Sequence, residues 1–189
     1  NLDKAVMKKN PQGINLNRNW ATSSWVLHEQ VEMGTETDPN ARGYPNSGQS
    51  PFEASELKEL SSWLLQLRDS SDRGLKAVSY HARVPFGYVQ PSYTYQDDFD
   101  PKSLQPKTSL TNQKFSDLFK LDPADEAFAT LYADSSMYGY YQTYIWEYIT
   151  GEFLNWCGEN QISCIDVELP DSNLARLDIH FAANLTAIK

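Results

Sequence analysis

Apolar residues recur at helical spacing in the first third of the chain, after a turn-rich segment over 21–50. The sequence Ser50–Glu53 has the pattern of a capping box with Pro51 at the first helical position. A helix is therefore expected to begin there and to run over about 52–68. Its predicted core-facing stripe consists of Leu57, Leu60, Trp63, Leu64 and Leu67.

Two later segments alternate with a period of two residues, as half-buried strands do. In the first segment, over 75–82, one face carries Ala77, Ser79 and His81. In the second segment, over 162–169, one face carries Cys164, Asp166 and Glu168, and the other carries Ile165, Val167 and Leu169. Both segments end with an ionisable side chain near the carboxyl end of the predicted strand, where open α/β sheets place their sites. A shorter extended piece is expected over 86–89.

The rest of the pattern predicts helices between and after these strands. Short helices are expected over 109–121 and 122–133, the second capped by Asp122, and another over 151–160. Ser172 is expected to cap a final helix, and the aromatic run over 138–148 is expected to form a strand or a pocket wall. Strands that alternate with helices indicate an α/β layered fold, and a length of 189 residues predicts one domain.

Charge and composition exclude several classes of function. The net charge of −9 argues against a protein that follows nucleic-acid phosphates. No run approaches the roughly eighteen apolar residues that a membrane-spanning helix needs. The acidic cluster at 97–100 lies in a predicted loop over 90–108 and lacks the spacing of a calcium-binding loop, so a solvated loop is expected there.

The two cysteines, Cys157 and Cys164, form a C-x6-C pair. Such a pair is either a disulfide that closes a small loop or two buried thiols, and the spacing leaves both open. The C-x2-C spacing of structural zinc sites does not occur, so no structural zinc cluster is predicted.

Candidate chemistry is concentrated in three places. Asn17 and Arg18 stand in the short polar run Gly13–Trp20, and a guanidinium fork offers a carboxylate two parallel charge-assisted hydrogen bonds that a lysine cannot. His81 and Glu168 each end a predicted strand. Taken singly, each has a simpler interpretation: a surface arginine in a turn, a structural histidine and a solvated glutamate.

Together and in this order, the three places resemble motifs of the zinc carboxypeptidase family. The run G-I-N-L-N-R-N-W from Gly13 resembles the family's G-V-D-L-N-R-N-F, and S-Y-H from Ser79 resembles its S-x-H. The segment Y-I-T-G-E-F-L-N-W-C from Tyr148 resembles the Y-x-T-P-G-S-F-x-x-W-C segment of the murein peptide amidases in that family. The second cysteine and the E-L-P ending at Glu168 follow at matching distances.

The resemblance implies a fold and a chemistry. The fold would be three-layer α/β/α around a mixed, mainly parallel sheet, with its first strands before the sequence given. Zinc would be the cofactor, with His81 as one ligand. Glu168 would be the general base that takes a proton from the attacking water and passes it to the leaving amine. Asn17 and Arg18 would hold the substrate carboxylate.

Three further positions acquire roles from the same resemblance. Lys8 falls where relatives place an arginine that stabilises the oxyanion, and it supplies the charge without the fork. Tyr148 lies near the position of a mobile substrate-binding tyrosine. Leu154 lies near a pocket position that sets side-chain preference, where an apolar residue gives no partner for a basic side chain.

The chain also departs from the family pattern. An H-x-x-E pair supplies the family's first two zinc ligands before the asparagine–arginine segment, and this sequence has none there. Because a catalytic zinc needs three protein ligands, either the pair precedes Asn1 in a longer chain or the protein is a zinc-free relative. The first alternative is expected, because the start of the sequence resembles the family's N-P-D-G segment. Asn15 replaces an aspartate that orients a zinc-bound histidine, and a neutral amide supports that histidine less well.

The predicted function is therefore zinc-dependent hydrolysis of a terminal peptide or amide bond in a peptide or muropeptide. In the murein branch this is the bond between γ-D-glutamate and meso-diaminopimelate in cell-wall peptides. The alternatives are a zinc-free member that binds such peptides without catalysis, and a carboxypeptidase that acts on protein C-termini. The resemblance favours a cytoplasmic location.

Overall fold

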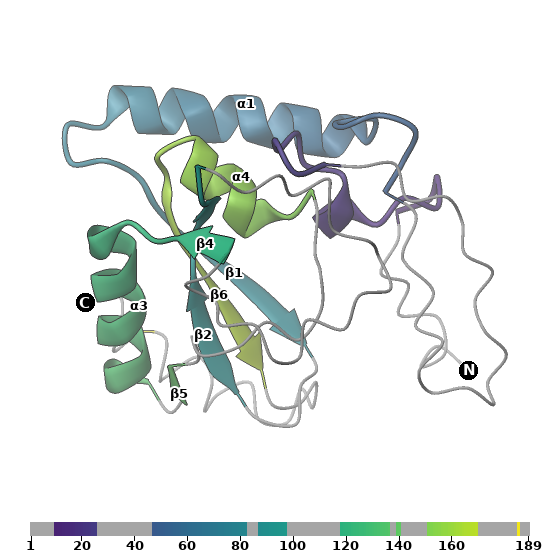
Figure 1. Cartoon of the computed structure of the whole chain (residues 1–189). Helices are drawn as coiled ribbons and strands as arrows, with labels where there is room; N and C mark the ends of the chain where they lie inside the picture. Colours follow the sequence, from purple (N-terminus) through teal and green to yellow (C-terminus); the bar gives the residue numbers. More distant parts are fainter. Residues whose placement is uncertain are drawn as a thin grey trace, which may run out of the picture.

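The structure is a computed structural model, and it describes residues 10–25, 47–82, 87–97, 118–136, 139–140, 151–169 and Leu185 (Figure 1). Its helical elements are the 3-10 helix η2 (Leu16–Arg18) and the α-helices α1 (Ser55–Ser70), α3 (Pro123–Ser135) and α4 (Phe153–Glu159). Its strands are β1 (Lys76–Ala82), β2 (Tyr88–Pro91), β3 (Thr94–Tyr95), β4 (Phe119–Lys120), β5 (Gly139–Tyr140) and β6 (Ser163–Leu169).

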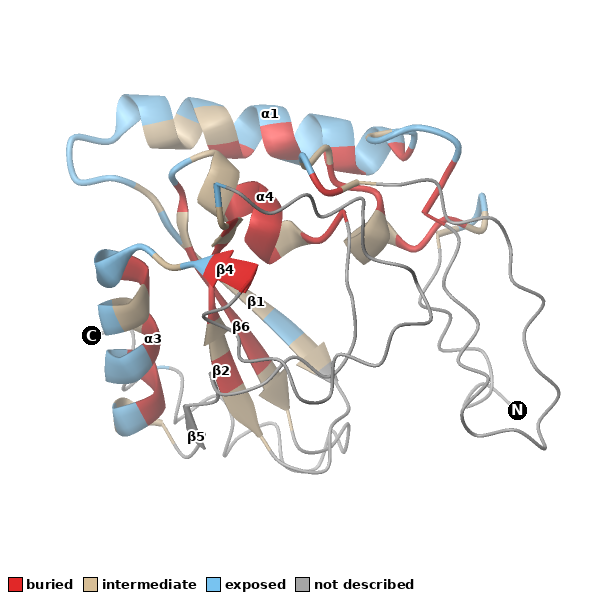
Figure 2. Cartoon of the chain, viewed as in Figure 1, coloured by how far each residue is buried: buried red, intermediate tan, exposed pale blue. Residues whose placement is uncertain are grey.

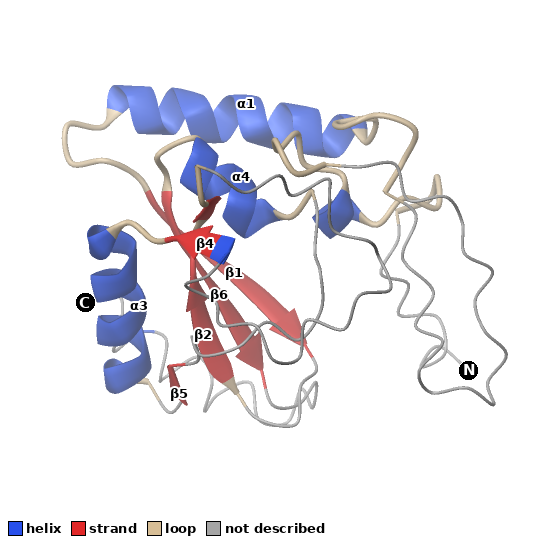
Figure 3. Cartoon of the chain, viewed as in Figure 1, coloured by secondary structure: helices blue, strands red, loops and turns tan. Residues whose placement is uncertain are grey.

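The central sheet has the strand order β1-β6-β2-β5 (Figure 3). β1 pairs with β6 and β2 pairs with β5 in parallel, whereas β2 and β6 are antiparallel. β3 and β4 form a separate antiparallel pair. The described sheet is therefore mixed and mainly parallel, as predicted.

Helices cover both faces of this sheet, so that the buried residues form two cores (Figure 2). On one face, α1 and α4 pack over Cys164 of β6, and Trp20 from the segment around η2 completes the cluster. On the other face, α3 packs on Val89, Ile165 and Val167. The α/β/α layering is thereby confirmed.

The alternation predicted for the last strand is confirmed in β6. Ile165 and Val167 are fully buried against α3, and Cys164 is fully buried in the other core. Because successive side chains of a strand point to opposite faces, Asp166 and Glu168 lie on the same side of the sheet as Cys164. That side faces α4.

The predicted start of the first long helix is wrong by about three residues. α1 begins at Ser55, and Phe52 has φ +54°, which is outside the helical region. The cause is Asn19, whose carbonyl accepts a hydrogen bond from Phe52 N at 2.8 Å and whose Oδ1 accepts one from Ala54 N at 2.9 Å. A side chain distant in sequence thus fixes the backbone just before α1, whose N-cap residue Ala54 receives no hydrogen bond from its own side chain.

The predicted buried stripe of α1 is confirmed only in part. Leu57 and Leu64 are buried, but Leu60 is 40% exposed and Trp63 is 55% exposed. Among the described residues, Leu60 and Trp63 belong to neither core cluster, so this side of α1 faces away from both cores.

Replacing Trp63 with Ser is therefore expected to change the free energy of unfolding by less than about 1 kcal/mol, because an exposed side chain contributes little to packing. The matched variant Leu64→Ala, one position along, should lose about 2 kcal/mol because it empties a core position. Urea denaturation of both variants checks this, and a larger loss for Trp63→Ser would show that the indole is covered.

Other predictions meet the structure with mixed results. Asp122 caps α3 by accepting a hydrogen bond from Ala124 N at 2.8 Å, as predicted.

The predicted loop over 90–108 is wrong where β3 forms, and the predicted helix over 109–121 is wrong where Phe119–Lys120 form β4. β5 begins the aromatic run as a strand; the rest of that run and the helix expected from Ser172 lie outside the described residues, apart from Leu185.

Cys157 on α4 and Cys164 on β6 are both buried and free, so of the two open alternatives the buried thiols are present. Burial raises the pKa of both thiols above the usual range of cysteine. Within the described ranges, no helix is long and apolar enough to cross a membrane.

Candidate functional site

His81 and Glu168 are opposite one another at the carboxyl ends of two neighbouring parallel strands. The β1–β6 register pairs His81 with Glu168 and Ser79 with Asp166. Neighbouring strands lie about 4.8 Å apart, so the four side chains form one group on the sheet face covered by α4. The strand ends thus bring together two residues that are far apart in the sequence.

The imidazole of His81 is fixed through one nitrogen. Its Nε2 lies 3.0 Å from Ser79 Oγ and 3.4 Å from Asp166 Oδ2. The hydrogen bond with Asp166 raises the pKa of His81 to about 9, against the opposing effect of burial, and the charges of Glu168 and Glu152 add to the rise. Within the described part of the chain, no residue hydrogen-bonds Nδ1.

The segment around η2 is fastened to the start of α4. Asn17 Oδ1 accepts a hydrogen bond from Phe153 N at 2.9 Å, and Trp20 N donates to Gly151 O at 3.0 Å. Gly151 has φ +63°, and a Cβ there would lie 2.5 Å from Arg18 O, so only glycine permits this approach. Among the described residues, no hydrogen bond engages Asn17 Nδ2, which can therefore donate to a ligand.

Arg18 and Asn15 complete this segment. Arg18 Nη1 donates to Asn17 O at 2.7 Å, and Asn15 Oδ1 accepts from Asn17 N at 3.0 Å. Asn15 thus caps η2. Among the described residues, no histidine contacts its Oδ1. Arg18 is half-buried, and its carbonyl lies close to Gly151, just before α4.

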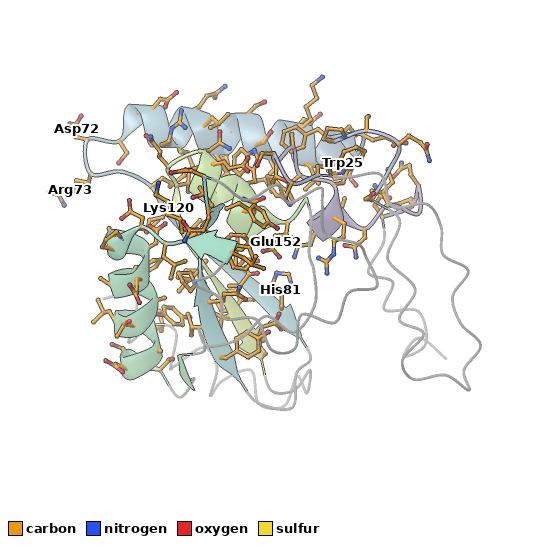
Figure 4. All side chains as sticks on the ribbon, viewed as in Figure 1. Trp25, Asp72, Arg73, His81, Lys120 and Glu152 are labelled. Atoms are coloured by element: carbon orange, nitrogen blue, oxygen red, sulfur yellow. The ribbon has the colours of Figure 1, made fainter. Side chains whose placement is uncertain are left out.

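Glu152 stands directly before α4 and is only 5% exposed. Its Oε1 accepts a hydrogen bond from the hydroxyl of the buried Tyr93. Burial, followed by the charge of Asp166, raises the pKa of Glu152 to about 7, while the hydrogen bond from Tyr93 and the charges of Arg18 and His81 act in the opposite direction. Figure 4 shows Glu152 and His81 beside one another between α4 and the sheet.

The structure therefore gathers Asn17, Arg18, His81 and Glu168 around the start of α4 and the ends of β1 and β6. Sequence reasoning did not select Glu152, Asp166 or Tyr93 for this site. Asp166 shares a strand face with Glu168, and that alternation was a signal. Glu152 and Tyr93 gave none, because their meeting depends on contacts between distant segments.

Leu154 on α4 lies in the core. It is 1% exposed and lies in the core cluster that contains Trp20 and Trp156, with its side chain away from solvent. Its role in substrate preference stays a prediction. Lys8 and Tyr148 lie outside the described residues, and their roles also stay predictions.

The described residues supply only part of the ligand set that a catalytic zinc ion needs. His81 fits as one ligand, because Nε2 is held by a carboxylate and a hydroxyl while Nδ1 is left to bind a metal, as in many protein metal sites. Among the described residues, however, no three His, Cys, Asp or Glu side chains form a group that could hold a metal. These residues therefore do not make a complete zinc site by themselves.

A histidine and a glutamate thus lie on adjacent parallel strands of an α/β fold, with the asparagine–arginine segment fastened to the start of α4. The sequence matches the family model for zinc carboxypeptidases over residues 2–176, and the chain belongs to that family. A comparison with curated proteins found no similar sequence.

Among solved structures, the chain is similar to the crystal structure of murein-tripeptide amidase MpaA from Escherichia coli O157, with a TM-score of 0.56 and 16% sequence identity. The match covers 94% of this chain and 60% of that one, so this chain spans less than two thirds of the length of the amidase. At this identity, the likeness establishes the fold.

Proposed function

We propose that this chain carries the substrate-anchoring and proton-transfer half of a peptidase or amidase site, which hydrolyses a peptide or amide bond next to a free carboxylate. The observation that carries the proposal is the β1–β6 register, which sets Glu168 beside His81 below the segment of Arg18. Membership of the zinc carboxypeptidase family supports it.

Each residue has a role that its position supports. Arg18 binds the substrate carboxylate through parallel hydrogen bonds, and Asn17 Nδ2 adds a third donor. Glu168 takes a proton from the attacking water and gives it to the leaving amine, which needs a carboxylate within hydrogen-bond reach of both. Asp166 and Ser79 hold the ring of His81 in one orientation.

Zinc dependence is part of the proposal. When bound, zinc would polarise the scissile carbonyl and lower the pKa of the attacking water. His81 would supply one ligand through Nδ1, and the others would have to come from residues that the structure does not describe. Metal content of the purified full-length protein tests this directly.

The proposed substrate is a cell-wall peptide, cleaved between γ-D-glutamate and meso-diaminopimelate in the course of cell-wall recycling in the cytoplasm. The likeness to a murein-tripeptide amidase supports this choice over a protein C-terminus. Turnover of a murein tripeptide compared with that of an N-blocked dipeptide separates the two.

Replacing Arg18 with Lys is expected to lower kcat/KM about 50-fold for a substrate with a free carboxylate, because the lysine loses one of two parallel hydrogen bonds. For the same substrate with its carboxylate amidated, the effect should be less than about 3-fold. Steady-state kinetics on both substrates measures this.

The control for that experiment is Arg68→Lys, which changes an arginine that donates to Asn160 O at the far end of α1. It should leave turnover unchanged. Equal losses for both substrates in Arg18→Lys would remove the carboxylate-anchoring role.

A second candidate function is a zinc-free protein that binds cell-wall peptides without cleaving them. The asparagine–arginine segment supports it, because that segment needs no metal to hold a carboxylate. Natively folded full-length protein with a metal content near zero would establish this function in place of the first, if it also binds the tripeptide and does not hydrolyse it.

A further inference from the structure

The outward side of α1 carries a hollow beside an exposed aromatic ring. Trp63 is 55% exposed, and Leu60, one turn before it, is 40% exposed. The hollow has a volume of about 510 Å³, which is within the range of small-molecule sites. It is lined by Ser55, Lys58, Glu59, Ser62, Trp63 and Gln66. Figure 1 shows α1 as the outer layer above α4, so the hollow is separate from the site at the strand ends.

Trp63 differs from the other tryptophans of the described ranges. Trp20 and Trp156 pack against one another in the core, with ring centroids 4.9 Å apart, and the indole of Trp25 lies against Gly151. Among the described residues, no second aromatic ring packs on Trp63. Burial of an aromatic ring is one of the largest favourable contributions to packing, so a ring left open beside a hollow marks a binding surface.

The charges around the hollow cancel. Lys58 and Glu59 have opposite signs, and the other side chains of the lining are neutral. The hollow thus has a formal charge of zero on a chain whose net charge is −9. Neither an anion nor a cation finds an excess of opposite charge there, so the electrostatic match is to an uncharged ligand.

The lining is nevertheless rich in hydrogen-bonding groups. The amide of Gln66 has two donor hydrogens and an acceptor oxygen. The hydroxyl of Ser62 donates to Lys58 O at 2.9 Å, which leaves its oxygen to accept. Within the described part of the chain, no hydrogen bond or ion pair engages the side chains of Gln66, Lys58 or Glu59. Donors and acceptors therefore surround the ring of Trp63.

A protein partner fits this surface poorly. A stable protein–protein interface uses about 20–30 residues a side and has an apolar core. On the exposed side of α1, Leu60 and Trp63 are the large apolar residues, and the rest of the hollow is polar. The combination of one flat ring with a neutral polar rim suits a small ligand instead.

We propose that the hollow beside Trp63 binds an uncharged saccharide, with one pyranose ring stacked on the indole. The face of an indole is electron-rich, and a pyranose presents weakly positive C–H bonds on its face and hydroxyl groups around its rim. The hydroxyl groups would meet Gln66, Ser62 and the two charged side chains. The lining extends from Ser55 to Gln66, about 16 Å along the helix at about 1.5 Å per residue, so a short oligosaccharide fits. This binding site goes beyond the proposed hydrolysis and does not rest on it.

The test titrates two uncharged saccharides, triacetylchitotriose and cellotriose, into the full-length protein by calorimetry. At least one of them should bind with a Kd of about 1 mM or below. Trp63→Ser should weaken this binding at least about 10-fold, because it removes the stacking face. Trp63→Phe keeps an aromatic face and should bind within about 3-fold of the unchanged protein.

The matched control is Leu131→Ser, which removes an apolar side chain that is 59% exposed on α3 and should leave the affinity unchanged. Binding of neither saccharide, or equal affinity in Trp63→Ser and the unchanged protein, would overturn the inference. So would equal losses in Trp63→Phe and Trp63→Ser, since the aromatic face would then have no role. Sedimentation of the same proteins covers the other occupant: a dimer that Trp63→Ser abolishes would show that a second copy takes this face.

Discussion

Replacing Glu168 with Gln is expected to lower kcat about 1,000-fold, since general acid–base catalysis by a positioned side chain contributes about 10²- to 10⁴-fold. Glutamine has nearly the same shape as glutamate but cannot accept a proton from the attacking water or deliver it to the leaving amine. Because Glu168 is half-buried at the open end of β6, the exchange should leave the fold and substrate affinity intact.

Three measurements check this: single-turnover hydrolysis, substrate affinity and metal content of the same preparations. Hydrolysis should be lost while the other two quantities match the unchanged protein. Glu59→Gln, which changes an exposed glutamate on α1, serves as the matched control. Unchanged turnover in Glu168→Gln would show that another group is the base, and a lost metal ion would show that Glu168 is a ligand instead.

The parts of the fold that the sequence predicted are those set by local pattern. Period-two alternation gave both faces of β6, and Asp122 with the following proline marked the start of α3. These signals depend on residues a few positions apart, where backbone geometry determines which side chains share a face.

The parts that the sequence did not predict depend on contacts across the chain. The start of α1 is set by Asn19, more than thirty positions earlier, as the Ala54 N–Asn19 Oδ1 bond shows with a separation of 35 residues. The strands β3 and β4 exist because Thr94 pairs with Lys120 and Tyr95 pairs with Phe119. No local propensity indicates such pairings.

The same division applies to the site. Asn17, Arg18, His81 and Glu168 were selected because their motifs resemble a family, and the structure brings them to one place. Glu152 lies in the segment that resembles the murein peptide amidases, but its significance comes from burial and from the hydroxyl of Tyr93, 59 positions away. Its charge was visible in the sequence, but its environment was not.

Glu152 also makes the stability of the protein depend on pH. The folded state raises the pKa of this carboxyl from 4.5 to about 7, chiefly through burial. The folded protein therefore holds a proton that the unfolded chain releases once the pH exceeds 4.5. The stabilisation is fully present below pH 4.5 and is lost as the pH rises through about 7. The loss amounts to about 3 kcal/mol, at about 1.4 kcal/mol per pH unit.

The variant Glu152→Gln is neutral at every pH and still accepts the hydrogen bond from Tyr93 through its amide oxygen, so it should not show this loss. It should be about as stable as the unchanged protein at pH 4.5 and about 3 kcal/mol more stable at pH 8. His81, with a pKa raised to about 9, gives a further loss between pH 6.5 and 9 in both proteins, so the difference between them isolates Glu152. Urea denaturation of metal-free protein at several pH values measures this difference. A difference that stays constant from pH 4.5 to 8 would show that the folded state does not raise the pKa of Glu152.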